Sequence, residues 1–329
     1  MPLLTLADAE ELVSRTLLRA RTGADNAASV ARALVAAEAD GLKGHGLTRV
    51  PSYAAQTKVG KVDGFAKPVL TRARASLLGI DAANGFAFPA LDLAVTALPE
   101  AARSQGVAAA AIRRSHHCGA AGFTVERLAE SGLVALMLSN TPSAMAPWGG
   151  SKAVFGTNPI AFACPLNGRA PLVIDLSLSK VARGNIVTAK QRGEKIPPGW
   201  ALDEGGQPTS DPDAALRGTM VPAGEAKGTA LALMVELLAA GLTGANFAAE
   251  ASSYLDAKGP PPGTGQLIVA FDPSAFGGDA IARFALLAQS IERQEGARLP
   301  GARRLAARKK AASEGLGISD ALLAEINAV

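Results

Sequence analysis

The spacing of apolar residues predicts two helices within residues 5–40. The stretch EELVSRTLLRA repeats apolar positions at helical spacing, and AASVARALVAAEA does the same after a break marked by Gly23 and Asp25. Thr5, followed three residues later by Asp8, predicts the N-terminal cap of the first helix. The segment 40–53 is interrupted by glycines and a proline, so we expect a loop there.

Short apolar runs predict a buried sheet from about residue 75 onward. Glycine, proline or asparagine bounds five runs of strand length: ASLLGID, VAAAAI, LVALML, IAFAC and PLVIDL. Helix-like stretches at 86–104 and 120–131 lie between them. Alternation of this kind is typical of an α/β domain.

The second half of the chain has fewer regular signals. Residues 190–219 are rich in turn formers, so we expect them to wrap the surface. The weakly charged stretch 228–249 carries Glu236 and several glycines, which favours a buried helix over a membrane span. A stiff loop at 259–266 precedes the strand LIVAFD, and helices follow, the last one capped at Ser319. No internal repeat or separable linker is visible.

Composition indicates an ordinary globular protein. The chain has 329 residues, 48% of them hydrophobic and 19% charged, which allows a large core and about two domains. Its net charge of +4 suits an anionic small substrate or a phosphorylated cofactor. The one dense basic stretch, RLPGARRLAARKK at 298–310, contains no aromatic residue, so we expect no nucleic-acid partner.

The two cysteines, Cys118 and Cys164, follow no disulfide or zinc spacing. Cys164 lies in an apolar run and is expected to be a small buried hydrophobe. The first residues contain no basic region leading into an apolar core, so no secretory signal is predicted. We therefore expect a cytoplasmic protein.

His45 is the first candidate for chemistry. It lies between Gly44 and Gly46, which leave its ring unobstructed, and Arg49 would share its face in a helical turn. A guanidinium can hold a substrate carboxylate while a nearby imidazole exchanges a proton. The alternative is a loop histidine beside an ordinary surface arginine, and the residues alone do not decide between them.

The stretch RRSHHCGAAGF, residues 113–123, contains the other two histidines. Adjacent side chains point apart and no further ligand completes a set, so we expect no metal site. Cys118 is a weak candidate nucleophile because His117 cannot easily turn toward it. A strand ending at Arg113 and a helix starting in GAAGF place the histidines at a strand-to-helix turn, where backbone N–H groups favour an anion.

Other polar residues follow strands in the same way. The stretches FGTNPIAFACP (155–165) and VIDLSLSKVARGN (173–185) bring polar side chains to strand ends, although Asp175 and Ser177 could equally be structural caps. Lys227 precedes a long apolar helix and is either a phosphate ligand or a solvated helix start. No G-x-G-x-x-G motif follows a strand, so a bound dinucleotide would not use a Rossmann turn.

Six ordered motifs carry a resemblance: GHGLTRVPSY, SHHCGAAG, APWGGSKAVFGTNPIAFACP, VIDLSLSKVARGN, GEAKGTALALMVELLAAGLTGANF and PPPGTGQLIVAFDP. Across essentially the whole chain they resemble the malate/L-lactate dehydrogenase-like family of NAD(P)-dependent oxidoreductases, and most closely its Δ1-piperideine-2-carboxylate/Δ1-pyrroline-2-carboxylate reductase branch. The resemblance implies an α/β fold with a non-Rossmann, mixed-sheet cofactor domain flanked by helices from both termini. It also implies a homodimer, no membrane partner and a small carboxylate substrate.

The expected domains are residues 1–70 with the substrate-binding loop, 71–275 with the NADP or NAD site, and 276–329 packing on the first segment. By resemblance, His45 would lie at the reacting centre and His117 would exchange the proton. The substrate-binding residues would be Arg49, Thr157 and Asn140. The cofactor-binding residues would be His116, His117, Cys118, Gly119, Ala120, Asp175, Leu176, Ser177, Arg183 and Lys227, with Arg303 and Arg304 contacting a 2′-phosphate.

Two departures from the imine reductase branch affect the mechanism. That branch has a serine where this chain has Gly44, and an aspartate where this chain has Asn185. Glycine and asparagine cannot replace ionisable or hydroxylic partners of His45. Either His45 works alone, or His117 carries the proton. We expect cyclic-imine reduction first and malate- or lactate-type oxidation second; a binding protein without turnover is the third reading.

Overall fold

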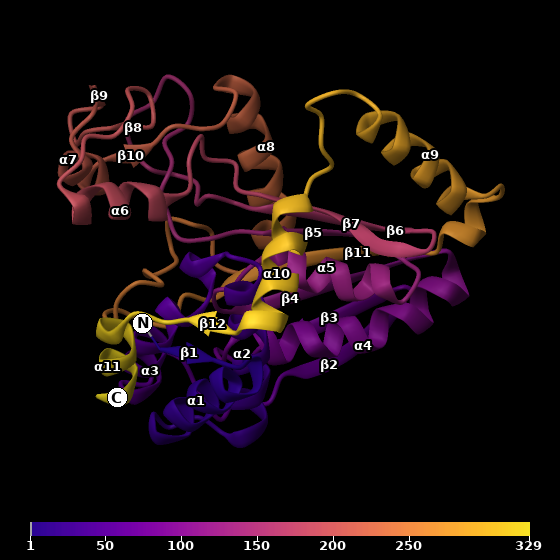
Figure 1. Cartoon of the computed structure of the whole chain (residues 1–329), viewed down its shortest axis with the longest axis horizontal. Coiled ribbons are helices and arrows are strands. Elements are labelled where there is room, and N and C mark those ends of the chain that lie inside the picture. The colour runs from indigo at the N-terminus through magenta and orange to yellow at the C-terminus, as the bar shows by residue number, and fades with distance from the viewer. Residues whose placement is uncertain (1) are drawn as a thin grey trace.

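The computed structural model describes residues 2–329 (Figure 1). Helices α1 (Leu6–Arg19) and α2 (Ala24–Ala39) open the chain, as predicted. The Thr5 hydroxyl accepts a hydrogen bond from the Asp8 N–H at 3.1 Å, and the Asp8 carboxylate accepts one from the Thr5 N–H at 3.3 Å. This reciprocal capping box confirms the predicted helix start.

The predicted loop at 40–53 is more ordered than expected. Two 3-10 turns, η1 (Lys43–His45) and η2 (Leu47–Arg49), lead directly into α3 (Val50–Lys58). Pro51 does not end this helix, because it lies in the first turn, where a missing N–H costs nothing. The prediction was therefore wrong over residues 50–53, and the consequence is that Arg49 lies directly before a helix, at its N-cap.

A seven-stranded sheet forms the centre of the molecule, in the order β2-β3-β4-β11-β5-β6-β7. Only β3 and β4 pair in parallel, so the sheet is mixed, as expected. The six predicted strands, LIVAFD among them, are all present. The strands are β2 (Val69–Arg74), β3 (Leu77–Asp81), β4 (Val107–Ser115), β5 (Val134–Ser139), β6 (Ile160–Leu166), β7 (Arg169–Leu176) and β11 (Thr264–Phe271).

The edge strand β2 escaped prediction because most of its residues are exposed and carry no apolar run. Helices α4 (Ala87–Gln105) and α5 (Ala121–Glu130) pack on the sheet, α4 against β3 and β4 and α5 against β5, β6 and β7. They match the predicted helical stretches at 86–104 and 120–131. Together with α1 and α2 they enclose the main core, which includes the fully buried Tyr53 and Phe86.

Residues 183–220 form a small separate layer rather than irregular turns. It contains α6 (Arg183–Arg192), α7 (Pro212–Arg217) and a three-stranded sheet of β8 (Ala201–Leu202), β9 (Pro208–Thr209) and β10 (Thr219–Met220). Helix α8 (Ala226–Glu236) continues into a π turn, η3 (Leu237–Gly241). The predicted helix at 228–249 was therefore too long, and one face of it is exposed.

The two ends of the chain lie together (Figure 1). Strand β1 (Leu3–Leu4) pairs with β12 (Leu316–Gly317), α10 (Ala302–Glu314) packs on α2, and α11 (Asp320–Asn327) packs on α3. Ser319 caps α11, as predicted, by accepting a hydrogen bond from the Leu322 N–H. Before them, η4 (Pro273–Phe276) and α9 (Ala280–Glu292) follow the sheet. The domain boundaries at 70 and 275 stay predictions.

Within residues 2–329 no helix combines the length and the apolar character needed to cross a membrane.

Candidate active site

The three histidines converge beside the end of β4. The strand ends at Ser115 and α5 begins at Ala121, which confirms the strand-to-helix turn that holds His116 and His117. The η1 turn brings His45 to the same place. The rings of His45 and His117 stack with their centroids 5.2 Å apart and their planes 11° apart. The sequence placed these residues 72 positions apart, and the fold makes them neighbours.

Two tyrosines enclose the histidines, and sequence reasoning did not single out either of them. The Tyr53 hydroxyl lies 2.5 Å from Nδ1 of His117, and the Tyr254 ring lies 5.1 Å from the His116 ring and 5.2 Å from the His117 ring. The sequence does contain a signal for Tyr53: His45, Arg49 and Tyr53 are spaced four residues apart, which is the spacing of residues on one helix face. For Tyr254 no local signal exists.

His116 is held inside the protein by Gln56. The Gln56 Nε2 donates a hydrogen bond to the Tyr254 carbonyl at 2.9 Å, which leaves its Oε1 to accept one from Nε2 of His116 at 2.8 Å. His116 is 1% exposed. Its ring therefore fixes α3 and the loop at Tyr254 against β4, while its backbone begins the turn before α5.

All three rings are uncharged at neutral pH. Burial, followed by the charge of Arg49, lowers the pKa of His45 to about 4. Burial, followed by the charges of Lys61 and Arg49, lowers the pKa of His116 to about 3. Burial also lowers the pKa of His117 well below its ordinary value, and Arg49 adds to the effect. A neutral imidazole can accept a proton from a substrate hydroxyl.

Arg49 is the cation shared by this cluster. Its Nε donates a hydrogen bond to the Gly44 carbonyl at 2.6 Å, and within residues 2–329 no carboxylate forms an ion pair with it. The terminal nitrogens of the guanidinium are thus free of protein partners, and the side chain is partly exposed. A free guanidinium beside neutral imidazoles suits a substrate carboxylate.

The two glycines beside His45 differ in what they permit. A Cβ on Gly46 would approach Oε2 of Glu38 to 2.2 Å, because that carboxylate accepts a hydrogen bond from the Leu47 N–H at 2.9 Å. A Cβ on Gly44 would meet nothing within 4 Å. Gly46 is therefore required by packing, whereas a serine could stand at position 44 without a clash.

Asn140 directly follows β5, and Thr157 lies shortly before β6, the strand that pairs with β5. The two side chains differ in exposure and in the number of their hydrogen bonds. Asn140 is fully buried: its Nδ2 donates to Oε1 of Glu236 at 3.1 Å and to the Asn246 carbonyl at 2.9 Å, and its Oδ1 accepts from the Gly265 N–H at 2.8 Å. Thr157 is partly exposed. Their contacts with substrate stay predictions, and for Asn140 the structure shows a scaffold role.

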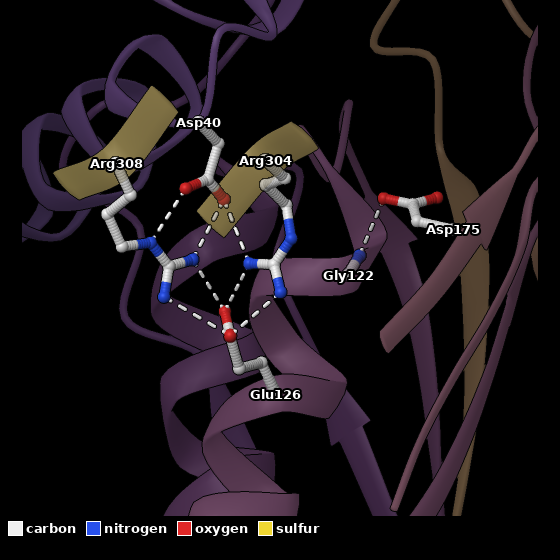
Figure 2. Close-up of polar contacts among 6 residues, drawn as sticks. All are labelled: Asp40, Gly122, Glu126, Asp175, Arg304 and Arg308. Carbon is white, nitrogen blue, oxygen red and sulfur yellow. Dashed lines mark hydrogen bonds and ion pairs between the residues drawn. The ribbon is translucent and has the colours of Figure 1, made fainter. Parts of the chain in front are cut away.

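The first turn of α5 already has a carboxylate beside it. Oδ2 of Asp175 accepts a hydrogen bond from the Gly122 N–H at 2.7 Å (Figure 2). Burial among surrounding atoms raises the pKa of Asp175, and the Gly122 N–H opposes that rise. A Cβ on Gly122 would come within 3.1 Å of the same oxygen, so only glycine permits this approach. An anion at this turn would meet the N–H groups that Asp175 leaves free.

The remaining cofactor candidates of this stretch surround that turn. Cys118 is buried with its Sγ 3.5 Å from the Ser139 hydroxyl, and Gly119 adopts a positive φ of 68° against the Phe88 ring. Leu176 is 44% exposed, and the Ser177 hydroxyl lies 3.1 Å from that of Ser179. Ala120 caps α5 through its backbone only. Their contacts with a cofactor stay predictions.

Arg304 is engaged elsewhere. Arg304 and Arg308 of α10 form a cluster with Asp40 and Glu126, in which both guanidiniums bind both carboxylates at 2.6–3.0 Å (Figure 2). The Arg304 side chain is 12% exposed. In this arrangement its terminal nitrogens bind carboxylates rather than lie free for a 2′-phosphate. Arg303, next to it, is exposed. Both phosphate contacts stay predictions.

Two other cations fit a polyanionic cofactor. Arg183 donates to the Leu216 carbonyl at 3.2 Å, its Nε is buried without a partner within residues 2–329, and burial lowers its pKa. Lys227 is exposed in the first turn of α8, two residues after Glu225, whose φ of 58° is strained for a residue with a side chain. The residues present therefore suit a phosphorylated ligand. Within the same residues, no group of three potential ligands could hold a metal.

A mixed-sheet α/β fold with a cluster of neutral histidines, beside a guanidinium to which no carboxylate is bonded within residues 2–329, is typical of an enzyme active site. The sequence profile of the malate/L-lactate dehydrogenase family matches residues 4–327. The chain belongs to this family, which confirms the predicted resemblance and the predicted enzyme class.

Particular relatives cover the whole chain. It is 51% identical to the (2R)-3-sulfolactate dehydrogenase (NADP(+)) of Chromohalobacter salexigens, over 99% of this chain and 97% of that protein. It is 42% identical to the Δ1-pyrroline-2-carboxylate/Δ1-piperideine-2-carboxylate reductase of Pseudomonas aeruginosa, over 99% and 98%. The crystal structure of Δ1-piperideine-2-carboxylate reductase from Pseudomonas syringae superposes with a TM-score of 0.94 at 39% identity, covering 100% and 99%. These matches confirm the predicted fold.

Proposed function

We propose that this protein is an NADP-dependent dehydrogenase that interconverts a small 2-hydroxy carboxylate and the corresponding 2-oxo carboxylate, with 3-sulfolactate and 3-sulfopyruvate as the substrate pair. The relative at 51% identity carries this activity in its name, whereas the imine reductases among the relatives are at 38–42%. This choice reverses the order expected from the motifs alone, where cyclic imines came first.

The observation that carries the proposal is the arrangement of Arg49 and the uncharged histidines. Arg49 has free terminal nitrogens, and its charge acts on all three rings. A doubly anionic substrate brings its own negative charge to this site. Within residues 2–329 no carboxylate is hydrogen-bonded to any of the rings, so the positive charge of Arg49 is not neutralised by a direct partner and can attract such a substrate.

Each residue then has a defined task. Arg49 binds the substrate carboxylate, and a neutral histidine takes the hydroxyl proton as the C2 hydrogen leaves as hydride. NADP, held by Lys227, Arg183 and the turn before α5, supplies the hydride acceptor when bound. The surrounding tyrosine rings exclude water from the proton-transfer path, because Tyr53 and Tyr254 are both buried.

Cyclic-imine reduction is the second candidate. The structural match at a TM-score of 0.94 favours it, and so does the space at Gly44, where that branch has its serine. Against it, His45 here has neither the serine nor the aspartate that the imine reductases place around it.

We further propose a homodimer in the cytoplasm. Several large apolar side chains of α8, of η3 and of the residue after η3 are exposed, which suits contact with a second copy of the chain: Leu231, Leu233, Met234, Leu237 and Leu242. Both cysteines are free and buried, which is consistent with a reducing compartment. Light scattering on the purified protein tests the dimer, and a monomer at micromolar concentration would contradict it.

The test of function is a matched set of rates. The protein is assayed for oxidation of 3-sulfolactate, malate and lactate with NADP and with NAD, and for reduction of Δ1-pyrroline-2-carboxylate and Δ1-piperideine-2-carboxylate with both reduced cofactors. We expect the highest kcat/KM with 3-sulfolactate and NADP. A higher kcat/KM with either cyclic imine would replace the first proposal by the second. Cofactor binding without turnover of any of them would leave a non-catalytic binding protein.

A further inference from the structure

Tyr53 has a single possible hydrogen-bond partner. It is fully buried, and within residues 2–329 its hydroxyl lies within hydrogen-bond distance of His117 Nδ1 alone. A buried O–H without an acceptor is destabilising by the full cost of its desolvation. The Tyr53 O–H must therefore donate to Nδ1, which has to carry the lone pair.

This donation fixes the tautomer of the neutral His117 ring. If Nδ1 is the acceptor, the ring proton is on Nε2. The groups that face the ring from every packed element support the neutral form: His45 from η1, Arg49 from η2, His116 from the turn after β4 and Tyr254 from its loop bring no negative charge. Burial raises the pKa of Tyr53, which therefore keeps its proton.

His45 is in the opposite situation. Its Nδ1 is buried and has no hydrogen-bond partner within residues 2–329, so no protein group sets its tautomer. Its ring stacks on that of His117 and is partly exposed. The His117 ring therefore presents its Nε2–H, whereas the His45 ring can accept a proton.

We propose that Tyr53 is a positioning residue that holds His117 as the Nε2–H tautomer, so that His117 donates a hydrogen bond to the C2 oxygen of the substrate and His45 takes the proton. The identity of the substrate in this inference rests on the proposed function. The tautomer of His117 does not, because it follows from the Tyr53 contact alone. In the oxidation, the O–H bond breaks and its proton goes to the His45 ring. The C2–H bond breaks, its electron pair leaves as hydride to the oxidised nicotinamide dinucleotide, and C2=O forms.

Tyr254 provides a matched control. The Tyr254 ring centroid lies 5.1 Å from that of His116 and 5.2 Å from that of His117, and the corresponding distances for Tyr53 are 5.3 and 6.1 Å. Tyr254 is also buried, but its hydroxyl bonds to the Thr264 hydroxyl at 2.6 Å. Tyr254→Phe thus removes a buried hydroxyl from the same cluster without touching His117 Nδ1. Any difference between Tyr53→Phe and Tyr254→Phe reports the bond to His117 rather than loss of a phenol.

The experiment is nitrogen-15 NMR of the histidine rings in the full chain at neutral pH. Only three histidines are present, so single substitutions assign the signals. We expect His117 to show an unprotonated Nδ1 and a protonated Nε2 in the wild type and in Tyr254→Phe, and a mixture of tautomers in Tyr53→Phe. Tyr53→Phe should lower kcat about tenfold, the effect of one hydrogen bond, with KM unchanged.

A protonated Nδ1 on His117 in the wild type would overturn the inference, and this result needs no variant that has to fold. Identical tautomers and identical kcat in Tyr53→Phe and Tyr254→Phe would overturn it as well. Failure of the proposed function looks different: no substrate is turned over, while the ring signals still report the tautomer.

Discussion

Two polar clusters are built on opposite principles: one includes Glu126 of α5, and the other lies at the turn before α5. The cluster of Asp40, Glu126, Arg304 and Arg308 contains four charges, each bonded to two of opposite sign. The histidine cluster contains neutral rings beside two cations, Lys61 and Arg49, and within residues 2–329 no carboxylate is bonded to the rings or to Arg49.

The difference shows which cluster can do chemistry. Burial alone would raise the pKa of Glu126, but hydrogen bonds from Arg304 and Arg308 hold it below its ordinary value, so the charges stay fixed. Around the histidines, burial and Arg49 hold the pKa values low, and the arrangement leaves both a proton acceptor and an anion-binding cation unsatisfied. The ion pairs of Glu126 with Arg304 and Arg308 therefore suit a role in stability, whereas the histidines and Arg49 suit substrate binding and proton transfer.

The largest effect on activity is expected from removing the His45 ring, whose Nδ1 has no hydrogen-bond partner within residues 2–329. His45→Ala should lower kcat by roughly 100- to 10,000-fold, the usual contribution of a general acid or base. The melting temperature should change little, since the buried Nδ1 of His45 forms no hydrogen bond within residues 2–329 and the side chain is partly exposed. Steady-state rates with 3-sulfolactate and NADP measure the loss. Lys43→Ala, an exposed change on the same turn, is the control; an equal loss there would assign the effect to the turn rather than to the ring.

The next effect concerns the charged cluster. Glu126→Gln should lower the free energy of unfolding by about 3–5 kcal/mol, because two guanidiniums lose a buried partner. Urea unfolding measures it. Glu100→Gln breaks an exposed pair with Arg72 and should cost less than about 1 kcal/mol. Below the unfolding transition, Glu126→Gln should keep its kcat; a kcat lost as in His45→Ala would show that the two clusters are not separate in function.

The smallest effect is expected at Gly44. Because a Cβ there meets nothing within 4 Å, Gly44→Ser should change the free energy of unfolding by less than about 0.5 kcal/mol. It places a hydroxyl beside His45, so the ratio of imine reduction to hydroxy-acid oxidation should rise. Gly46→Ser, which would collide with Glu38, is the steric counterpart and should be destabilising. An unchanged substrate ratio in Gly44→Ser would mean that position 44 does not set specificity.

The sequence was informative where the interactions are local. Thr5 and Asp8 are three residues apart, and the buried strands are continuous apolar runs, so caps and strands could be predicted. The pairing of Tyr53 with His117 joins residues 64 positions apart, and that of Arg304 with Asp40 joins residues 264 apart. Such contacts depend on how the elements pack. For that reason the carboxylate partners of Arg304 and the contact of Tyr53 with His117 were not predicted.

The central claim is that an uncharged histidine with a depressed pKa accepts the substrate proton. Its most direct test is the pH dependence of kcat/KM for NADP-dependent oxidation of 3-sulfolactate. A base must be unprotonated, and the pKa of His45 is about 4, so kcat/KM should stay constant as the pH falls from 8 to about 5.5. A fall with a midpoint near the ordinary histidine value of about 6.5 would contradict the account.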